Sequence, residues 1–210
     1  MEHAASHAGD AIEHFIDEAH EQPLHAETST GLDHRKLVMW IFIASETIFF
    51  AALMATFLIY KGSVPPEEGP EHLNIWVASA NTFILLFSSL TMVLSLQSIE
   101  NGNKKRMIFF LIATAFWGLV FLGGQAYEYS ELIANGISYD SNLWASSFFT
   151  LTGFHGTHVF VGVIWITALI IRALRGGISE HNHLSVELGG LYWHFVDLVW
   201  VVLFTIIYLI

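Results

Sequence analysis

Hydrophobic residues gather along the chain in five long runs that are separated by polar stretches. The runs cover about residues 37–60, 75–96, 107–127, 147–171 and 188–210. A transmembrane helix needs about 20 consecutive, mostly apolar residues, and each run reaches that length. The pattern therefore predicts an all-α integral membrane protein, a bundle of five transmembrane helices.

The stretches between the runs carry residues that end helices and prefer water. They read KGSVPPEEGPEH, QSIENGNKKR, EYSELIANGISYDSN and RALRGGISEHNH. Proline, glycine and clustered polar residues interrupt helices and mark loops. We therefore expect four solvated connections within a membrane domain that covers residues 35–210.

Residues 1–34 differ in composition and are expected to form a solvated tail. The segment contains six of the 12 histidines and the acids Glu2, Asp10, Glu13, Asp17, Glu18, Glu21, Glu27 and Asp33. It has no basic stretch followed by an apolar one, so it does not resemble a signal peptide and should stay on the mature protein. His3 and His7 share a helical face, which suggests metal binding as an alternative. Acid-rich segments bury too little apolar surface to fold alone, which favours the solvated tail.

Composition supports the membrane assignment and narrows the chemistry. The chain is 54% hydrophobic and 13% charged, against about 45–50% and 25% in a soluble domain. The net charge of −11 argues against binding to nucleic acid. Cysteine is absent, so this chain offers no disulfide, iron–sulfur cluster, thiolate zinc site or thiolate copper centre.

The positions of lysine and arginine predict an orientation in the membrane. Seven of the eight lie on the N-terminal side of the expected bundle, and one, Lys61, lies opposite; the seven are Arg35, Lys36, Lys104, Lys105, Arg106, Arg172 and Arg175. Basic residues concentrate in cytoplasmic loops. The N-terminus should therefore be cytoplasmic and the C-terminus outside.

Ionisable residues inside the expected helices are the candidate functional groups. They are Glu46, His155, His158, His194 and Asp197, with Glu128 nearer to a membrane interface. Charged side chains in mid-bilayer cost about 2.5–3.5 kcal/mol on insertion scales and usually mark function or specific pairing. At about 1.5 Å per residue, Glu46, His158 and Asp197 lie roughly 13–20 Å from the cytoplasmic side, close to the middle.

Spacing leaves three interpretations of these residues open. Zinc or iron would need three or four convergent ligands, such as His155, His158, His194 and an acid, but the HExxH pattern is missing. Haem ligation by histidine pairs is equally undetermined. A proton route would use the carboxylates as ion pumps do. Interhelical hydrogen bonds, between a His155/His158 face and a His194/Asp197 face, are the simplest interpretation and the one that spacing favours.

Other polar and aromatic residues in the runs receive a structural interpretation. Ser88, Ser89 and Thr91 are expected to bond back to the preceding turn of their own helix. Trp193 and Trp200 are expected to pack or to anchor the helix at an interface. Neither group predicts a function.

Four motifs, in register along residues 35–210, resemble the signature stretches of subunit III of haem–copper terminal oxidases. They are ASETIFF at 44–50, QAYEY at 125–129, FFTLTGFHGTHVFVG at 148–162 and YWHFVDLVW at 192–200. The chain is similar to the short, five-helix bacterial form of this cytochrome c oxidase subunit III family. The seven-helix form has two further helices before the first run, and phospholipid binds in a cleft that those helices help to form.

The resemblance implies a non-redox accessory subunit in the respiratory chain of the cell inner (plasma) membrane. Haem and copper are then carried by partner subunits, no cofactor is bound to this chain except phospholipid, and no catalytic residue is present. The implied partners are oxidase subunit I in direct contact, subunit II, a small fourth subunit, membrane lipids and a respiratory supercomplex. Subunit III in the family stabilises subunit I and supports proton uptake during proton translocation.

The resemblance also implies roles for single residues. Glu46 falls on the family's buried, carbodiimide-reactive carboxylate. The polar interhelical residues His155, His158, His194 and Asp197 fall on family motif positions, as do Gln125, Tyr127 and Glu128 of an interface motif, and none of them is a metal ligand. Cytochrome c is the expected electron donor. The alternatives are a quinol oxidase subunit III, a homologous subunit of nitric oxide reductase and, from another class, a stand-alone membrane metalloenzyme or ion channel.

The orientation predicts how a tag at the C-terminus behaves. A protease-sensitive tag fused after Ile210 should be cut from the outer face of sealed cells and protected in inside-out vesicles, because the charge bias places that end outside. Cleavage only from the cytoplasmic face would contradict the orientation.

Overall fold

A computed structural model describes residues 33–66, 69–179 and 182–210. The predicted properties of the tail up to residue 32 therefore lie outside the described residues. The chain divides into two units, Met1–Val38 and Met39–Ile210. In the first unit the Asp33 carboxylate accepts a hydrogen bond of 2.8 Å from the Arg35 backbone N–H and so caps the helix that begins there.

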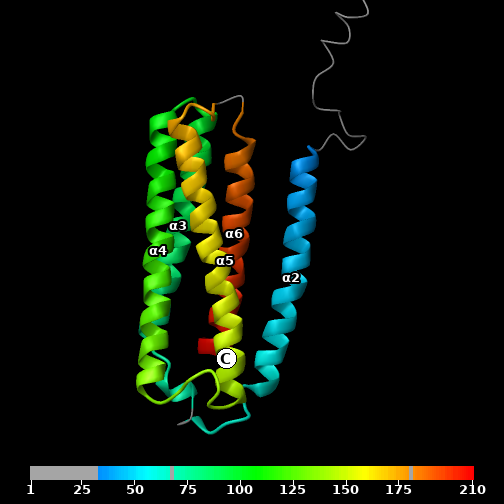
Figure 1. The fold of residues 1–210 in the computed structure, drawn as a ribbon, viewed down its shortest axis with the longest axis vertical. Coiled ribbons are helices and arrows are strands. Elements are labelled where there is room, and N and C mark those ends of the chain that lie inside the picture. Colours follow the sequence, from blue (N-terminus) through cyan, green and yellow to red (C-terminus); the bar gives the residue numbers. More distant parts are fainter. Residues whose placement is uncertain (1–32, 67–68, 180–181) are drawn as a thin grey trace, which may run out of the picture. The chain divides into compact units, whose positions relative to one another are not determined.

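Five long helices make up most of the described chain (Figure 1). They are α2 (His34–Tyr60), α3 (Ile75–Glu100), α4 (Lys104–Ala134), α5 (Leu143–Leu174) and α6 (Leu184–Phe204). A 3-10 turn, η2 (Pro70–His72), precedes α3, and a π-helical turn, η3 (Thr205–Leu209), follows α6. Each of the five long helices is long and apolar enough to cross a membrane. The predicted fold class, an all-α membrane protein with five spans, is confirmed.

The helices extend beyond the predicted spans. The α5 helix has 32 residues, which at about 1.5 Å per residue is roughly 48 Å, against about 30 Å of hydrocarbon. Only the middle of such a helix has to be apolar. Hydropathy therefore finds the part that lies in lipid and misses the polar turns that continue the same helix.

Asparagine and glycine set where helices end and begin. Gly102, with φ 71°, follows α3 and donates to Ile99 O, while Asn103 N donates to Ser98 O. These two bonds and a left-handed glycine form a Schellman motif. The Asn103 side chain then accepts a bond from Arg106 N at the start of α4. A single residue thus closes one helix and caps the next, which keeps the connection short.

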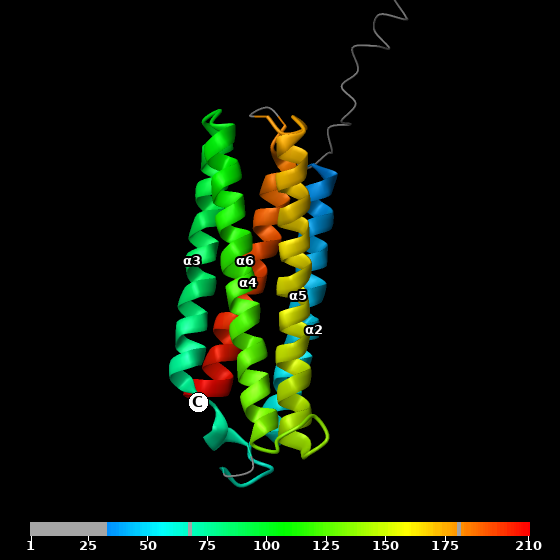
Figure 2. The same cartoon turned by 60° about the vertical axis from the view of Figure 1, so that its left-hand side comes forward.

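Helices α3, α4, α5 and α6 form a bundle whose main contacts join α3 to α4, α4 to α5, α5 to α6 and α6 to α3. Successive helices run in opposite directions (Figures 1 and 2). From Met39 onward α2 lies beside α5 and α6 and contacts them through long side chains, including Phe49 against Phe154 and Phe42 against Tyr192. Its buried residues are only Met39, Phe50 and Phe57.

Trp193 of α6 lies at the centre of the bundle. Its side chain is fully buried, and its indole N–H donates a bond of 2.9 Å to the Ser88 hydroxyl of α3. Gly118 of α4 and Gly162 of α5 face its ring, so closely that a methyl group at these positions would lie 2.6 and 2.8 Å from ring atoms. One side chain therefore contacts three other helices, and two glycines make room for it.

This packing predicts a difference between two glycines of the same helix. Gly118→Ala should lower the free energy of unfolding by about 1–3 kcal/mol, because the added methyl overpacks the rigid indole. Gly123→Ala is the matched control, since nothing lies within 4 Å of the added methyl. Thermal unfolding in detergent, followed by tryptophan fluorescence, measures both variants. Equal stability of the two would contradict the packing described for Trp193.

Candidate functional site

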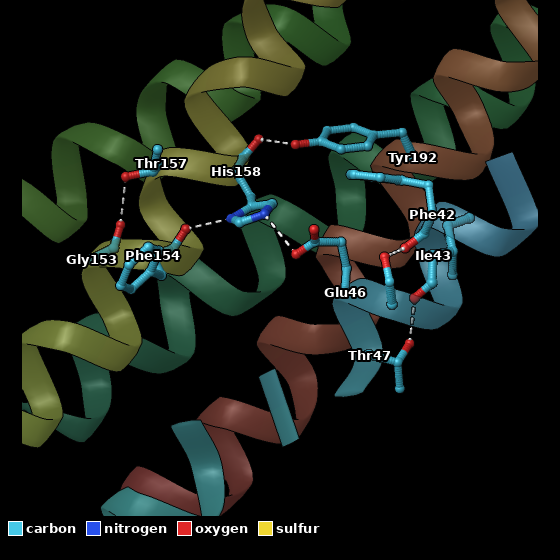
Figure 3. A network of polar contacts seen from close by, with 10 residues as sticks. Phe42, Ile43, Glu46, Thr47, Gly153, Phe154, Thr157, His158 and Tyr192 are labelled. Atoms are coloured by element: carbon cyan, nitrogen blue, oxygen red, sulfur yellow. Dashed lines mark hydrogen bonds and ion pairs between the residues drawn. The ribbon is translucent and has the colours of Figure 1, made fainter. Parts of the chain in front are cut away.

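Glu46 of α2 and His158 of α5 form a polar contact inside the membrane domain (Figure 3). His158 Nε2 lies 3.3 Å from Glu46 Oε2, and the two side chains are 18% and 22% exposed. On the other side of the ring, His158 Nδ1 lies 2.7 Å from the Phe154 carbonyl oxygen. The contact joins α2 to the bundle near the middle of its length.

A hydrogen bond between the Glu46 and His158 side chains needs a hydrogen between the two facing atoms. A carbonyl oxygen only accepts, so the bond to Phe154 places a hydrogen on Nδ1 of His158. Nε2 then faces a carboxylate oxygen. Two acceptors attract each other only with a hydrogen between them. A hydrogen bond between them therefore needs a hydrogen either on Nε2 or on the Glu46 carboxyl group.

Neighbouring side chains fix the position of the His158 ring. Phe50 packs edge-on against it, with ring centroids 5.0 Å apart. The Tyr192 hydroxyl of α6 donates a bond of 2.9 Å to the backbone carbonyl of His158. Three helices thus meet at this residue, one through its carboxylate partner, one through its own backbone and one through a tyrosine.

His155 has a different environment from His158 although both lie on α5. It is fully buried, and its Nε2 lies 3.2 Å from the Val196 carbonyl oxygen of α6, so this nitrogen carries the hydrogen. The ring lies between Phe121 and Trp200, with centroids at 5.6 and 4.9 Å. Its Nδ1 has no hydrogen-bond partner among the described residues.

His194 and Asp197 of α6 lie toward α3. The Ser89 hydroxyl of α3 is 2.6 Å from His194 Nδ1. Asp197 is 4% exposed, and neither carboxyl oxygen has a hydrogen-bond partner in the part of the chain that the structure describes. Ser89 lies beside this carboxyl group as well. His194 is therefore bonded to α3, and Asp197 lies beside the same serine of that helix.

Gln125, Tyr127 and Glu128 are divided between the inside and the surface of the bundle. Gln125 is buried, and its amide donates to the Thr152 carbonyl oxygen of α5 at 2.7 Å. Glu128 is also buried and accepts a bond of 2.7 Å from the Tyr208 hydroxyl in η3. Tyr127 is exposed. Gln125 and Glu128 tie α4 to other elements, and of the three residues only Tyr127 faces outward.

The predicted pairing of a His155/His158 face with a His194/Asp197 face differs from this geometry. Residues three apart on an α-helix point about 60° away from each other around its axis. On α5 that angle turns His158 to α2 and His155 to α6, and His194 turns to α3. Within the described residues no group of three or more histidines, cysteines or acids is placed to hold a metal ion.

The sequence predicts only some of the contacts made by the hydroxyl groups of α3 and by Glu128. Ser88 and Thr91 bond back to Leu85 O and Ser88 O of their own helix, as predicted. Each also meets another side chain, since Ser88 accepts from Trp193 and Thr91 pairs with Thr114 of α4. Ser89, for which the same back-bonding was predicted, is bonded to His194 of α6 instead. The bond between Glu128 and Tyr208 was not predicted. Tyr208 lies in an apolar run, where no sequence signal indicated a partner.

The fold and these contacts define a class of protein, a multi-pass helical membrane protein whose buried polar residues join helices in pairs. Comparison with known sequences specifies the family. A model of the family described as "Cytochrome c oxidase subunit III" matches residues 11–210. The chain belongs to the cytochrome c oxidase subunit III family, and its role is that of subunit III of a haem–copper oxidase.

Individual relatives agree over most of their length. "Cytochrome c oxidase subunit 3" of Bacillus sp. (strain PS3) is 36% identical over 199 residues, which cover 90% of this chain and 96% of the relative. The protein of the same name from Thermostichus vulcanus is 37% identical, with 93% and 92% covered. "Probable quinol oxidase subunit 3" of Staphylococcus aureus is also 37% identical, with 83% and 88% covered.

The contact between Glu46 and His158 predicts a measurable coupling. Glu46→Ala and His158→Ala should each destabilise the protein, and the double variant should lose less than the sum, with a coupling of about 0.6–2 kcal/mol. Equilibrium unfolding of the four proteins in detergent gives this value. Thr157→Ala is the control on α5, because the Thr157 hydroxyl bonds only to its own helix, at Gly153 O. Strict additivity of the Glu46 and His158 variants would show that the contact contributes nothing.

Proposed function

We propose that this chain is an accessory subunit without a redox centre, which stabilises the catalytic subunit of a proton-pumping haem–copper oxidase and supports its proton uptake. The separation of the ionisable residues within the helices carries this proposal. Glu46 is joined to α5, His194 to α3 and Glu128 to η3. Residues dispersed over three contacts support helix packing better than they support a shared reaction centre.

Haem and copper belong, in this proposal, to partner subunits. Subunit I is the direct partner, and subunit II, a small fourth subunit and membrane lipid complete the surroundings, with a respiratory supercomplex as a larger assembly. The surface of α2 supports contact with such neighbours, because Ile48 and Ile59 are 73% and 74% exposed. Apolar side chains of this kind require lipid or another membrane helix.

Cytochrome c is the proposed electron donor, by analogy with the relatives from Bacillus sp. and Thermostichus vulcanus, which are named as cytochrome c oxidase subunits. Quinol is the second candidate, because the relative named as a probable quinol oxidase subunit is equally similar at 37% identity. The donor binds elsewhere in the assembly, so this chain fits either enzyme.

The proposed location is the bacterial plasma membrane. The connections between α3 and α4 and between α5 and α6 lie at one end of the bundle, and the connection after α2 lies at the other (Figure 1). Lys104, Lys105 and Arg106 begin α4 and Arg172 and Arg175 lie at the end of α5, whereas Lys61 follows α2. This charge bias supports a cytoplasmic position for the end with more basic residues.

Purification tests the proposed function directly. The full chain, tagged after Ile210 and extracted in mild detergent, should bring down a haem-containing partner that consumes oxygen, because the chemistry resides on that partner. A reduced-minus-oxidised difference spectrum of the same sample distinguishes the donors, since a haem c signal indicates cytochrome c. Isolation of the chain alone, without haem but with stoichiometric zinc or iron, would refute the accessory role.

A further inference from the structure

Polar side chains join α3 and α6 at successive levels. Trp200 donates to the Thr82 hydroxyl at 3.0 Å, and Trp193 donates to the Ser88 hydroxyl at 2.9 Å. Ser89 meets His194 at 2.6 Å. At each of these levels a donor faces an acceptor, so the interface is closed by matched pairs.

Asp197 lies between Trp193 and Trp200 on the same helix and has no such match. It is 4% exposed, and both oxygens of its carboxyl group lack a hydrogen-bond partner among the described residues. Burying a polar group without a hydrogen bond destabilises the folded protein, and burying an ionised group destabilises it more. Buried polar groups in folded proteins are almost always bonded, to protein or to an internal water molecule.

Ser89 is oriented to take part in such a bond. Thr82, Ser88 and Thr91 donate their hydroxyl hydrogens to carbonyl oxygens of α3. Ser89 instead directs its hydroxyl to His194 of α6. A hydroxyl has one donor and two acceptor positions, so the His194 contact leaves capacity for another. Ser89 lies beside the Asp197 carboxyl group, but its hydroxyl does not meet the geometry of a hydrogen bond to either carboxyl oxygen.

We propose that Ser89, His194 and Asp197 form a binding site for one internal water molecule between α3 and α6. The water bridges the Ser89 hydroxyl and the Asp197 carboxyl group, and His194 holds the Ser89 hydroxyl in place. A polar contact that is close but not directly bonded is commonly completed by a bridging water. Water donates two hydrogens and accepts two, so it can bond to an oxygen of the carboxyl group in either protonation state.

A metal ion fits this place less well than water. Structural zinc takes four protein ligands and catalytic zinc three, whereas His194 and Asp197 supply two, and Ser89 only a hydroxyl. The inference concerns contacts inside this chain and does not depend on the proposed function.

A density map of the purified full-length protein, with its partners, at a resolution that shows ordered waters tests the site. A peak should appear within hydrogen-bonding distance of both Ser89 Oγ and an Asp197 oxygen. A direct bond between Ser89 and Asp197, or an empty space between them in a map that shows other internal waters, would overturn the proposal. The result depends only on the density between Ser89 and Asp197 and not on which partners co-purify. Failure of this proposal and failure of the proposed function can therefore be distinguished.

A double-mutant cycle gives an independent measurement. Ser89→Ala and Asp197→Leu should each raise the rate of thermal unfolding of the chain, and the double variant should fall short of the product of the two effects by at least about threefold. Ser88→Ala combined with Asp197→Leu is the matched control and should multiply, because Ser88 serves Trp193. Asp197→Asn, which keeps the shape and can still bond to water, should stay close to the parent protein. Multiplicative behaviour of the Ser89 pair, or an Asn variant as unstable as the Leu variant, would contradict the site.

Discussion

The close approach of four helices around the Trp193 indole is the constraint on which the rest of the structure depends. Glycine at positions 118 and 162 lets the ring lie against the α4 and α5 backbones, and Ser88 accepts its N–H. In lipid there is no hydrophobic force between helices, so close packing and hydrogen bonds hold them together. A large side chain surrounded by small residues provides the packing, and its single polar atom provides one of the bonds.

The helices outside this contact are held more loosely, and polar residues then decide their position. The α2 helix buries few side chains, and the contact of Glu46 with His158 therefore fixes both its height and its rotation beside α5. A misplaced helix would leave a carboxylate in lipid without its partner, which is costly. Few alternative positions of α2 avoid that cost. The polar pair thus contributes more to the choice of one arrangement than its modest energy suggests.

Much of this fold could be predicted from the sequence, because the length of an apolar run is a direct consequence of bilayer thickness. Glu46, His158 and Asp197 can also be identified from the sequence, because ionisable side chains inside an apolar run are costly in lipid. Their partners were not predicted, because a neighbour depends on how each helix is rotated. A difference of about 60° separates the directions of residues three apart, and it sends His155 and His158 to different helices. The part-buried bond of Tyr208 to Glu128 is made from the π-helical turn of η3, which no local sequence pattern predicts.

Lys61 shows how folding can change the meaning of a charge. It is the one basic residue at its end of the bundle, and its ammonium group donates a bond of 2.8 Å to the Ile206 carbonyl oxygen near the end of the last helix. The final carbonyls of a helix lack partners within that helix and carry partial negative charge. During insertion, the Lys61 charge opposes the bias of the other seven basic residues. In the folded chain this charge is stabilised by the end of a helix 145 residues further along the sequence. The end of the first span is thereby fastened to the last helical turn, and this contact can form only after residue 206 has been synthesised.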